Sequence, residues 1–327
     1  MSGAPRVAFA GLAHSHPHTD AAGAAALGAQ VVAVYDSDAT AAGDFAERFG
    51  GVAVDSPDIL IAHRPDVIVA TPRPDEVLST LRALRETAAA VPVFFNKVLA
   101  ATEQQFADVD RALAVQRKSV GTASVLRFAP ALAQLAAELS GDEIFSIRAH
   151  AQHDNEAFRL PDRRWQDDPA QGGGTLVTVG VHAWQMIDRA VPGAILESAV
   201  GWTARSSDTL SEDVGGIQGR LRLADGRAIS VQATVSGVPG ADRYSLEVIS
   251  ARGVHTIDLD VDDALEQLGF RGLVRALIDD APRGEVPAPW AEARAVVANT
   301  IHAARAARGE QPTDFGLPME DPPGLRP

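Results

Sequence analysis

The first third of the chain alternates short apolar runs with longer helix-like stretches, which limits the fold more than any other feature. Each run is rich in β-branched residues and has no polar face, as is typical of parallel strands covered on both sides. This predicts strands at residues 7–10, 31–35, 67–70, 93–95 and 120–125. Helical spacing of apolar residues predicts helices at 19–27, 40–49, 75–89 and 102–116. The order predicts an N-terminal doubly wound Rossmann domain over residues 1–122.

The pattern changes after about residue 122. A helix is expected at 131–139, and strand-like runs follow at 144–150, 198–204, 215–223, 228–235, 244–249 and 254–259. Asp225-Gly226 between two of these runs is typical of a tight hairpin, so this sheet should be mostly antiparallel. Helices are expected at 263–280 and 291–307. We therefore predict a C-terminal α/β domain at 123–310 and a proline-rich tail at 311–327.

Composition excludes several classes of protein. The 327 residues are 46% hydrophobic and 22% charged, which excludes disorder over most of the chain. The net charge of −14, without a basic block, argues against nucleic-acid binding. The absence of cysteine excludes disulfides, thiolate metal sites and cysteine nucleophiles. Without an apolar run of about 18 residues or a signal-peptide pattern, we expect no membrane association and a cytoplasmic location.

The first expected strand ends in a loop that keeps one glycine of the dinucleotide-binding pattern G-x-G-x-x-G. Those glycines allow a tight turn, close approach of a diphosphate and packing of the next helix. Gly11 keeps the first position, while Ala13 and His16 stand at the other two. A plain strand–helix turn stays open as the alternative. The loop residues that we expect to contact a dinucleotide are Gly11, Ala13, His14, Ser15 and His16.

Asp36 ends the second expected strand, 25 residues after Gly11. An acid at this distance can accept hydrogen bonds from a ribose diol and repels a 2′-phosphate, which favours NAD over NADP. NADP stays open, because a turn or helix-capping aspartate is a common alternative. The nearby His14, His16 and His18 also suit a metal site. The hydrolase barrels that begin with such a pair are parallel throughout, whereas this chain turns antiparallel, so we expect no metal.

Two later strand ends carry polar groups to the edge where ligands bind in open α/β sheets. Thr71 and Pro72 follow one of these strands, and Asn96 and Lys97 follow the next. We expect Thr71, Pro72 and Asn96 to contact the cofactor. A partly buried lysine has a lowered pKa, which suits a proton donor or acceptor near neutral pH. A solvated surface lysine is the alternative for Lys97.

The most specific segment runs from Trp165 to His182 and contains three consecutive glycines before an expected helix. Thr178 and His182 stand four residues apart, so a helix would present them on one face. A histidine there can bind a substrate hydroxyl, and Trp165 offers a flat face to a sugar-like ring. A glycine hinge beside a packed histidine is the alternative.

These motifs, in this order, resemble the Gfo/Idh/MocA oxidoreductases, the family of glucose–fructose oxidoreductase and inositol dehydrogenase. The resemblance spans roughly residues 6–308. The matching segments are Gly11, Asp36, residues 70–72, 96–98, 125–130, 172–182, 211–213 and 244–248. The resemblance implies a Rossmann domain, a second α/β domain with an open sheet, and a homo-oligomer (dimer or tetramer) formed through that sheet. It also implies NAD(P) and reversible oxidation of a sugar or cyclitol hydroxyl.

The family's signature lysine falls on Lys97 and its late histidine on His182, and we take both as catalytic. The family's Glu-Lys-Pro reads Asn96-Lys97-Val98 here, so we expect no cis bond after Lys97. The family's aspartate four residues before the histidine is Thr178, which removes an anion that would balance the charge of Lys97. The residues that we expect to contact the substrate are Arg127, Gln152, His153, Trp165 and Thr178.

Together these features predict an NAD(P)-dependent oxidoreductase that moves a hydride between a nicotinamide and a secondary hydroxyl or ketone. Its small-molecule substrate would be a sugar- or cyclitol-like polyhydroxy compound, with Lys97 as general acid/base. Two alternatives stay open. One is non-redox chemistry with a retained NAD, such as elimination, epimerisation or glycoside cleavage. The other is a ligand sensor that kept the fold and lost catalysis.

Overall fold

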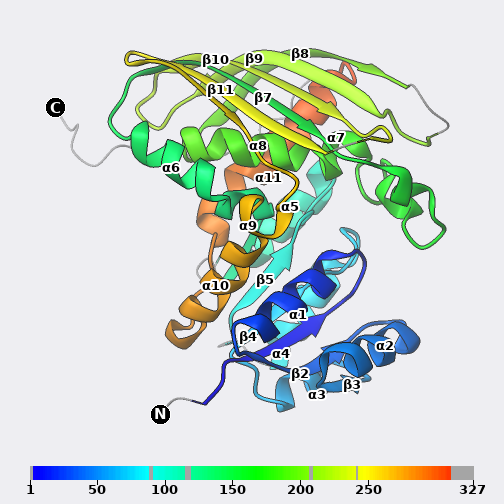
Figure 1. Cartoon of the computed structure of the whole chain (residues 1–327). Coiled ribbons are helices and arrows are strands. Elements are labelled where there is room, and N and C mark those ends of the chain that lie inside the picture. The colour runs from blue at the N-terminus through cyan, green and yellow to red at the C-terminus, as the bar shows by residue number, and fades with distance from the viewer. Residues whose placement is uncertain (1–2, 88–90, 115–118, 206–208, 241, 311–327) are drawn as a thin grey trace.

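A computed structural model describes residues 3–87, 91–114, 119–205, 209–240 and 242–310 (Figure 1). The predicted tail at 311–327 and the ends of the helices predicted at 75–89 and 102–116 lie outside the described residues. Six parallel strands form the first sheet in the order β3-β2-β1-β4-β5-β6, the strand order of a Rossmann fold. Their bounds are β1 (Arg6–Ala10), β2 (Gln30–Tyr35), β3 (Val52–Val54), β4 (Val67–Ala70), β5 (Val93–Asn96) and β6 (Val120–Ala123).

Helices cover both faces of this sheet, as the two-sided apolar runs predict. They are α1 (His16–Ala26), α2 (Ala39–Phe49), α3 (Pro57–Ala62), α4 (Val77–Thr87) and α5 (Glu103–Leu113). Alternate residues of β1 point to opposite faces: Phe9 belongs to the core that contains Phe45 of α2, and Ala8 to the core that contains Phe106 of α5. Asp38 caps α2 by accepting from the amide of Thr40 at 2.9 Å.

The sequence-based boundaries differ from the structure in several places. The edge strand β3 and helix α3 were not predicted, because segments of three and six residues are too short to show a hydrophobic period. Helix α1 begins at His16, three residues earlier than predicted. The strand predicted at 120–125 ends at Ala123 and continues as the 3₁₀ turn η1 (Val125–Phe128). The helix predicted at 263–280 is broken into α9 (Ala264–Gln267) and α10 (Phe270–Asp280) by Gly269, which has φ +92°.

The second sheet has the order β12-β11-β7-β10-β9-β8. Its strands are β7 (Ile144–Gln152), β8 (Ile195–Ala204), β9 (Val214–Arg222), β10 (Ala228–Ser236), β11 (Arg243–Ser250) and β12 (Gly253–Asp258). The predicted hairpin joins β9 and β10, with the Leu223 amide donating to the Arg227 carbonyl at 2.8 Å. The central pair β7–β10 is parallel and the other pairs are antiparallel. The sheet is therefore mixed, and mostly antiparallel as predicted.

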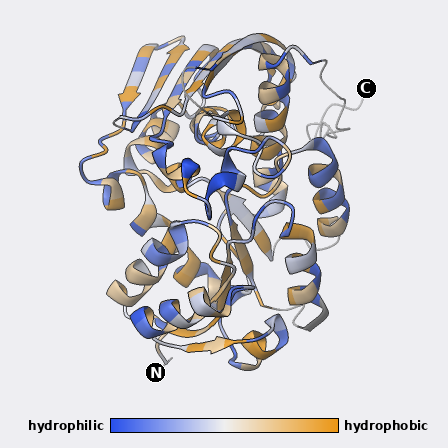
Figure 2. Ribbon diagram, turned by 90° about the vertical axis from the view of Figure 1, so that its right-hand side faces the viewer, coloured by the Kyte–Doolittle hydropathy of each residue, from blue (hydrophilic) through white to orange (hydrophobic). Residues whose placement is uncertain are grey.

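Helices cover one face of this sheet and leave the other open (Figure 1). The covering helices are α6 (Pro130–Glu138), α7 (Thr175–Thr178) and α8 (Gly180–Ala190). Hydrophilic and hydrophobic residues alternate along the strands, as expected when one face meets solvent (Figure 2). The open face exposes Val200 and Trp202 of β8, at 76% and 51%. Along the chain, the first sheet ends at Ala123 and the second begins at Ile144, and we propose the domain boundary near residue 122.

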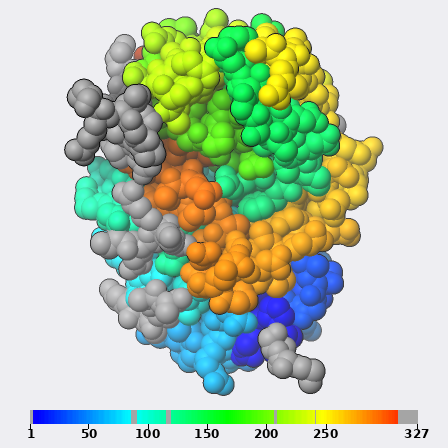
Figure 3. Space-filling model, turned by 90° about the vertical axis from the view of Figure 1, so that its left-hand side faces the viewer, coloured from blue at the N-terminus to red at the C-terminus, as the bar shows by residue number. Residues whose placement is uncertain are grey.

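The last helix, α11 (Trp290–Ala307), packs against both halves of the molecule. Its Trp290 indole donates to Asp110 of α5 at 2.9 Å, and Arg294 binds the same carboxylate through two bonds of 2.7 and 2.8 Å. Figure 3 shows the orange C-terminal segment between the green and yellow atoms above and the blue atoms below. Among the described helices, none has the length and apolar character needed to cross a membrane.

Candidate functional site

A groove of about 670 Å³ lies at the carboxyl ends of the parallel strands, the edge at which ligands bind in such sheets. Its walls are built by the loops after β1, β2 and β4, together with Asp162 and Arg163 from the second half of the chain. The predicted cofactor residues that line this groove are Gly11, Ala13, Asp36, Thr71 and Pro72. The sequence motifs thus converge on one site, although they are up to 61 residues apart.

The loop after β1 lies pressed against the end of β4. Gly11 has φ +85°, and a Cβ atom there would stand 2.9 Å from backbone atoms of Thr71 and Pro72. The amide of Ala13 donates to the Thr71 carbonyl at 3.0 Å. The carboxylate of Asp36 is held in place by the amide of Leu12 at 2.6 Å and that of Asp38 at 2.8 Å. Backbone geometry therefore sets the floor of the groove.

The predicted cofactor residues His14, Ser15, His16 and Asn96 do not line this groove. The His14 Nε2 donates to the Lys97 carbonyl at 2.9 Å, and burial, with the charge of Lys97, lowers the pKa of His14 to about 3. The ring of His16 packs edge-on against His14 and Phe270, and burial lowers its pKa well below the ordinary value. Both imidazoles are therefore neutral at neutral pH. Ser15 is exposed at the start of α1 and makes no capping hydrogen bond.

His18, the third histidine of the loop, lines the groove and packs against Phe45 and Phe49. Within the part of the chain that the structure describes, no group of three or more His, Cys, Asp or Glu side chains could hold a metal ion.

Asn96 links three elements beneath the groove instead of facing it. Its amide group donates to Asp20 of α1 at 2.9 Å and to the Thr71 hydroxyl at 3.0 Å. Burial raises the pKa of Asp20 to about 7, although the bond from Asn96 acts in the opposite direction. Asp20 was not predicted as a site residue, because a single acid in an alanine-rich helix belongs to no recognisable motif.

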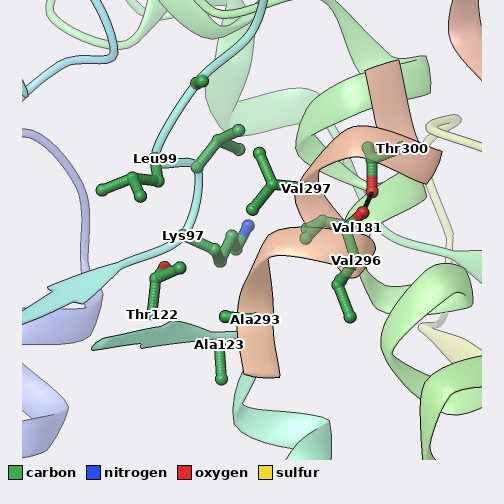
Figure 4. Close-up of a pocket in the computed structure, with 11 residues that line it drawn as sticks. Lys97, Leu99, Thr122, Ala123, Val181, Ala293, Val296, Val297 and Thr300 are labelled. Atoms are coloured by element: carbon green, nitrogen blue, oxygen red, sulfur yellow. Dashed lines mark hydrogen bonds between the residues drawn. The ribbon is translucent and has the colours of Figure 1, made fainter. Parts of the chain in front are cut away.

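Lys97 is almost wholly buried, and its Nζ donates to the backbone carbonyl of Thr178 at 3.2 Å. Its stem lies near Val181, Val296 and Val297 around a cavity of only about 10 Å³ (Figure 4). Burial lowers the pKa of Lys97 to about 8, the negative charge of Asp242 raises it, and the positive charge of Arg163 lowers it. The peptide bond from Lys97 to Val98 is cis, which corrects the expectation of a trans bond there.

His182 lies in the first turn of α8, where its Nδ1 is 2.7 Å from the hydroxyl of Ser124. Burial first, and then the charges of Lys97 and His153, lower the pKa of His182 well below its ordinary value. Lys97 binds the carbonyl of Thr178, and its charge acts on His182, so the structure places these two residues near each other.

Thr178 and His182 do not share one continuous helix, because α7 ends at Thr178 and α8 begins at Gly180. The Thr178 hydroxyl donates to the Gly174 carbonyl at 2.9 Å. Its backbone carbonyl, not its side chain, meets Lys97.

Three of the other predicted substrate residues are engaged elsewhere. Arg127 pairs with Asp188 at 3.4 Å and with Glu292, and it lines a separate cavity of about 440 Å³. Trp165 is 5% exposed and lies beneath Gly172, so it offers no flat face to a ring. Gln152 donates to the Val238 carbonyl at 2.8 Å and accepts from Ser236. These positions were inferred from sequence order, which does not reveal such partners.

Unlike these three residues, His153 lies beside a predicted catalytic residue: its ring centroid is 6.4 Å from that of His182. The same cluster contains Tyr244, with its ring centroid 5.3 Å from that of His182. Sequence reasoning missed three residues here, Ser124, Asp242 and Tyr244, as well as Arg163 at the groove. Tyr244 stands in the segment 244–248 that resembles the family but was assigned no role there, and the other three belong to no motif.

Comparison with solved structures finds proteins of the same architecture. GenD2 from gentamicin A biosynthesis, in complex with NAD, matches with a TM-score of 0.78 and 20% identity over 94% of this chain and 95% of that one. A myo-inositol dehydrogenase from Corynebacterium glutamicum matches with a TM-score of 0.75 and 16% identity over 94% and 98%. A myo-inositol dehydrogenase from Lactobacillus casei, in complex with NAD(H) and myo-inositol, matches with a TM-score of 0.70 and 16% identity over 94% and 96%.

A scan against protein-family models and a search of curated proteins found no match. The likeness is therefore one of architecture: a six-stranded parallel sheet followed by a six-stranded mixed sheet, matched over nearly the whole of each chain. The chain has the two-domain fold of the Gfo/Idh/MocA oxidoreductases.

Proposed function

We propose that the chain is an NAD-dependent oxidoreductase that interconverts a secondary hydroxyl and a ketone on a sugar- or cyclitol-like substrate. The observation that carries the proposal is the convergence of Lys97 and His182 from separate halves of the chain. Arg163 joins this pair to the groove, because it lines the groove and its charge acts on Lys97. Two proteins of like fold, GenD2 in complex with NAD and a myo-inositol dehydrogenase in complex with NAD(H) and myo-inositol, support the same class of reaction.

The groove residues fit a dinucleotide. A Cβ atom at position 11 would clash with the backbone of Thr71 and Pro72, so the glycine there allows the tight turn that a dinucleotide-binding loop needs. The carboxylate of Asp36 would accept hydrogen bonds from a ribose diol and would repel a 2′-phosphate, so we propose NAD over NADP. Gly11, Ala13, Thr71 and Pro72 would form the rest of the cradle. When bound, the nicotinamide supplies the hydride acceptor or donor.

In this proposal Lys97 moves the proton. As an alcohol is oxidised, the neutral amine accepts the hydroxyl proton while the hydride leaves the same carbon. In the reverse direction the ammonium returns that proton to the oxygen. Because the pKa of Lys97 is about 8, both forms are populated near neutral pH. Oxidation should therefore gain rate as pH rises through about 8, and reduction should lose it. His182, neutral because it is buried, would hold a neighbouring hydroxyl.

Replacing Lys97 tests the proposal. Lys97→Ala should lower kcat by about 10²–10⁴-fold, because it removes the proton acceptor, while NADH binding followed by fluorescence is retained. The chain has one other lysine, Lys118, outside the described residues, and Lys118→Ala is the matched control. Near-normal turnover of Lys97→Ala would contradict the proposed role. Titration with NADPH beside NADH measures the cofactor preference.

The same assay separates the two alternatives. Turnover of substrate without net change in nicotinamide absorbance would favour non-redox chemistry with a retained NAD. Dinucleotide binding without turnover across a broad panel of polyols would favour a sensor. We also propose that copies of the chain associate, as a dimer or a tetramer, through the open face of the second sheet, where Val200 and Trp202 are exposed. The molar mass in solution measures this association.

A further inference from the structure

The chain that enters β11 brings a carboxylate, that of Asp242, near enough to Lys97 for its charge to act on the ammonium. Asp242 Oδ1 lies 3.0 Å from Nδ1 of His153 and also accepts from the amide of Asp154 at 2.8 Å. The hydroxyl of Tyr244 lies 3.2 Å from the same Nδ1. Asp242 is thus held between an imidazole and a backbone amide in a half-buried position.

The charged and titratable groups around Lys97 come from several elements. His14 and His16 face it from the loop after β1 and the start of α1, His182 from α8, and Arg163 from the loop beside the groove. The histidines among these are neutral, because burial lowers their pKa, and Arg163 is a cation. The carboxylate whose charge acts on Lys97 is Asp242.

The direct partner of the Lys97 ammonium is an uncharged group. Its Nζ donates to the carbonyl of Thr178, and the Thr178 side chain is a hydroxyl bonded to Gly174. A buried ammonium without a nearby anion is costly, so a carboxylate near it has a large effect on its protonation. The effect is mutual. Burial raises the pKa of Asp242, but the hydrogen bonds from His153 and the Asp154 amide, together with the charge of Lys97, lower it below its ordinary value.

We propose that Asp242 completes the proton-transfer site as a positioning residue: it holds His153 with Nδ1 protonated and supplies Lys97 with the negative charge that position 178 lacks. This proposal rests on the proposed function for its role in turnover. A carboxylate that accepts from Nδ1–H selects one tautomer of the imidazole. The Nε2 of His153 is then an acceptor for a substrate hydroxyl beside His182. Asp242 thereby acts on both residues: it accepts from the ring of His153, and its charge favours the ammonium form of Lys97.

Nuclear magnetic resonance of the substrate-free protein tests the assignment directly. With Lys118→Arg as background, Lys97 is the chain's remaining lysine, and ¹³C-labelled lysine reports its titration alone. Asp242→Asn keeps the oxygen that accepts from the Asp154 amide and removes the charge. The titration midpoint of Lys97 should fall by about one pH unit, because the anion that favours the ammonium is gone. Asp258→Asn, an exposed carboxylate of β12 paired with Arg243, is the matched control and should leave the midpoint in place.

Two results would overturn the proposal. One is an unmoved Lys97 midpoint in a folded Asp242→Asn protein. The other is a ¹⁵N-histidine spectrum in which His153 of the unaltered protein carries its proton on Nε2. Neither measurement needs turnover, so they stand apart from the dehydrogenase assay. Where the enzyme is active, Asp242→Asn should also move the alkaline limb of the reduction pH profile downward by the same amount. If the Lys97 midpoint falls in Asp242→Asn but the protein shows no turnover, the proposed role of Asp242 is supported and the proposed function is contradicted.

Discussion

Burial decides the protonation state of the titratable side chains around Lys97 and beneath the groove. Lys97, His14 and Asp20 are each enclosed, and in each case desolvation moves the pKa in the direction that favours the neutral form. As a result Lys97 and Asp20 titrate nearer to neutral pH than they would in water, whereas His14 stays neutral there. For Asp20 the raised pKa makes the free energy of unfolding depend on pH, which can be measured.

We expect Asp20→Asn to stabilise the protein increasingly as pH rises. The folded-state pKa of Asp20, about 7, lies above its ordinary value of 3.8, so between those values the folded protein holds a proton that the unfolded chain has released. The free energy of unfolding therefore falls with rising pH, by up to roughly 4 kcal/mol above pH 7. Asparagine can still accept from Asn96 but does not titrate. Urea denaturation at pH 5 and pH 8 should give a larger difference between the two proteins at pH 8, and equal differences would refute the assignment.

At the level of elements, the turn from β1 to α1 explains why one glycine suffices. Gly11 has positive φ and a backbone neighbour where Cβ would stand, whereas Ala13 and His16 are not among the described residues with positive φ. Ala13 instead binds the end of β4 through its backbone. The departure from G-x-G-x-x-G thus changes the side chains beside the groove without changing the path of the turn.

We expect Gly11→Ala to weaken dinucleotide binding and to destabilise the fold by more than Gly28→Ala. Both positions have positive φ, which costs alanine about 1 kcal/mol. A Cβ at position 28 meets nothing within 4 Å, whereas one at position 11 would clash with Thr71 and Pro72 and push the loop into the groove. Thermal unfolding and NADH titration compare the two variants. Equal loss of stability and equal affinity in both would show that the clash has no effect.

At the level of the whole molecule, the C-terminal helices hold the two sheets together. Helix α10 packs against α1, and α11 packs against α5, α8 and β8. The polar centre of this contact is Asp110, which accepts from Trp290 and pairs with Arg294. The chain therefore returns to its first half after completing the second, so the site between them depends on its last helix.

Asp110→Ala should lower the free energy of unfolding by about 2–4 kcal/mol, because it leaves a partly buried guanidinium and an indole N–H without this carboxylate. Asp108→Ala is the control on the same helix. Asp108 pairs with Arg111, whose side chain is 75% exposed, and its removal should change stability by at most about 0.5 kcal/mol. Urea denaturation measures both. Similar losses for the two variants would mean that the contact with α11 contributes little.

Local patterns in the sequence were enough to predict the first sheet and the mostly antiparallel second sheet, whereas the choice of Lys97 and His182 as a pair came from the family resemblance. The alternation of apolar runs with helix-like stretches, the positions of glycines and the ends of strands depend on neighbouring residues only. They can therefore be recognised without knowing the contacts between distant segments. Identity to the compared dehydrogenases of 20% or less is compatible with this, because the fold depends on the pattern more than on the residues.

Only the tertiary structure decided which side chains meet. It paired Arg127 with Asp188 and Glu292, buried Trp165 in the core, and brought Asp242 to His153 from 89 residues away. It also set the parallel pairing of β7 with β10. Desolvation, ion pairing and strand order depend on contacts between distant segments, and no local pattern records them. The sequence thus determines where the reactive groups stand along the chain, whereas their protonation and their partners arise from packing.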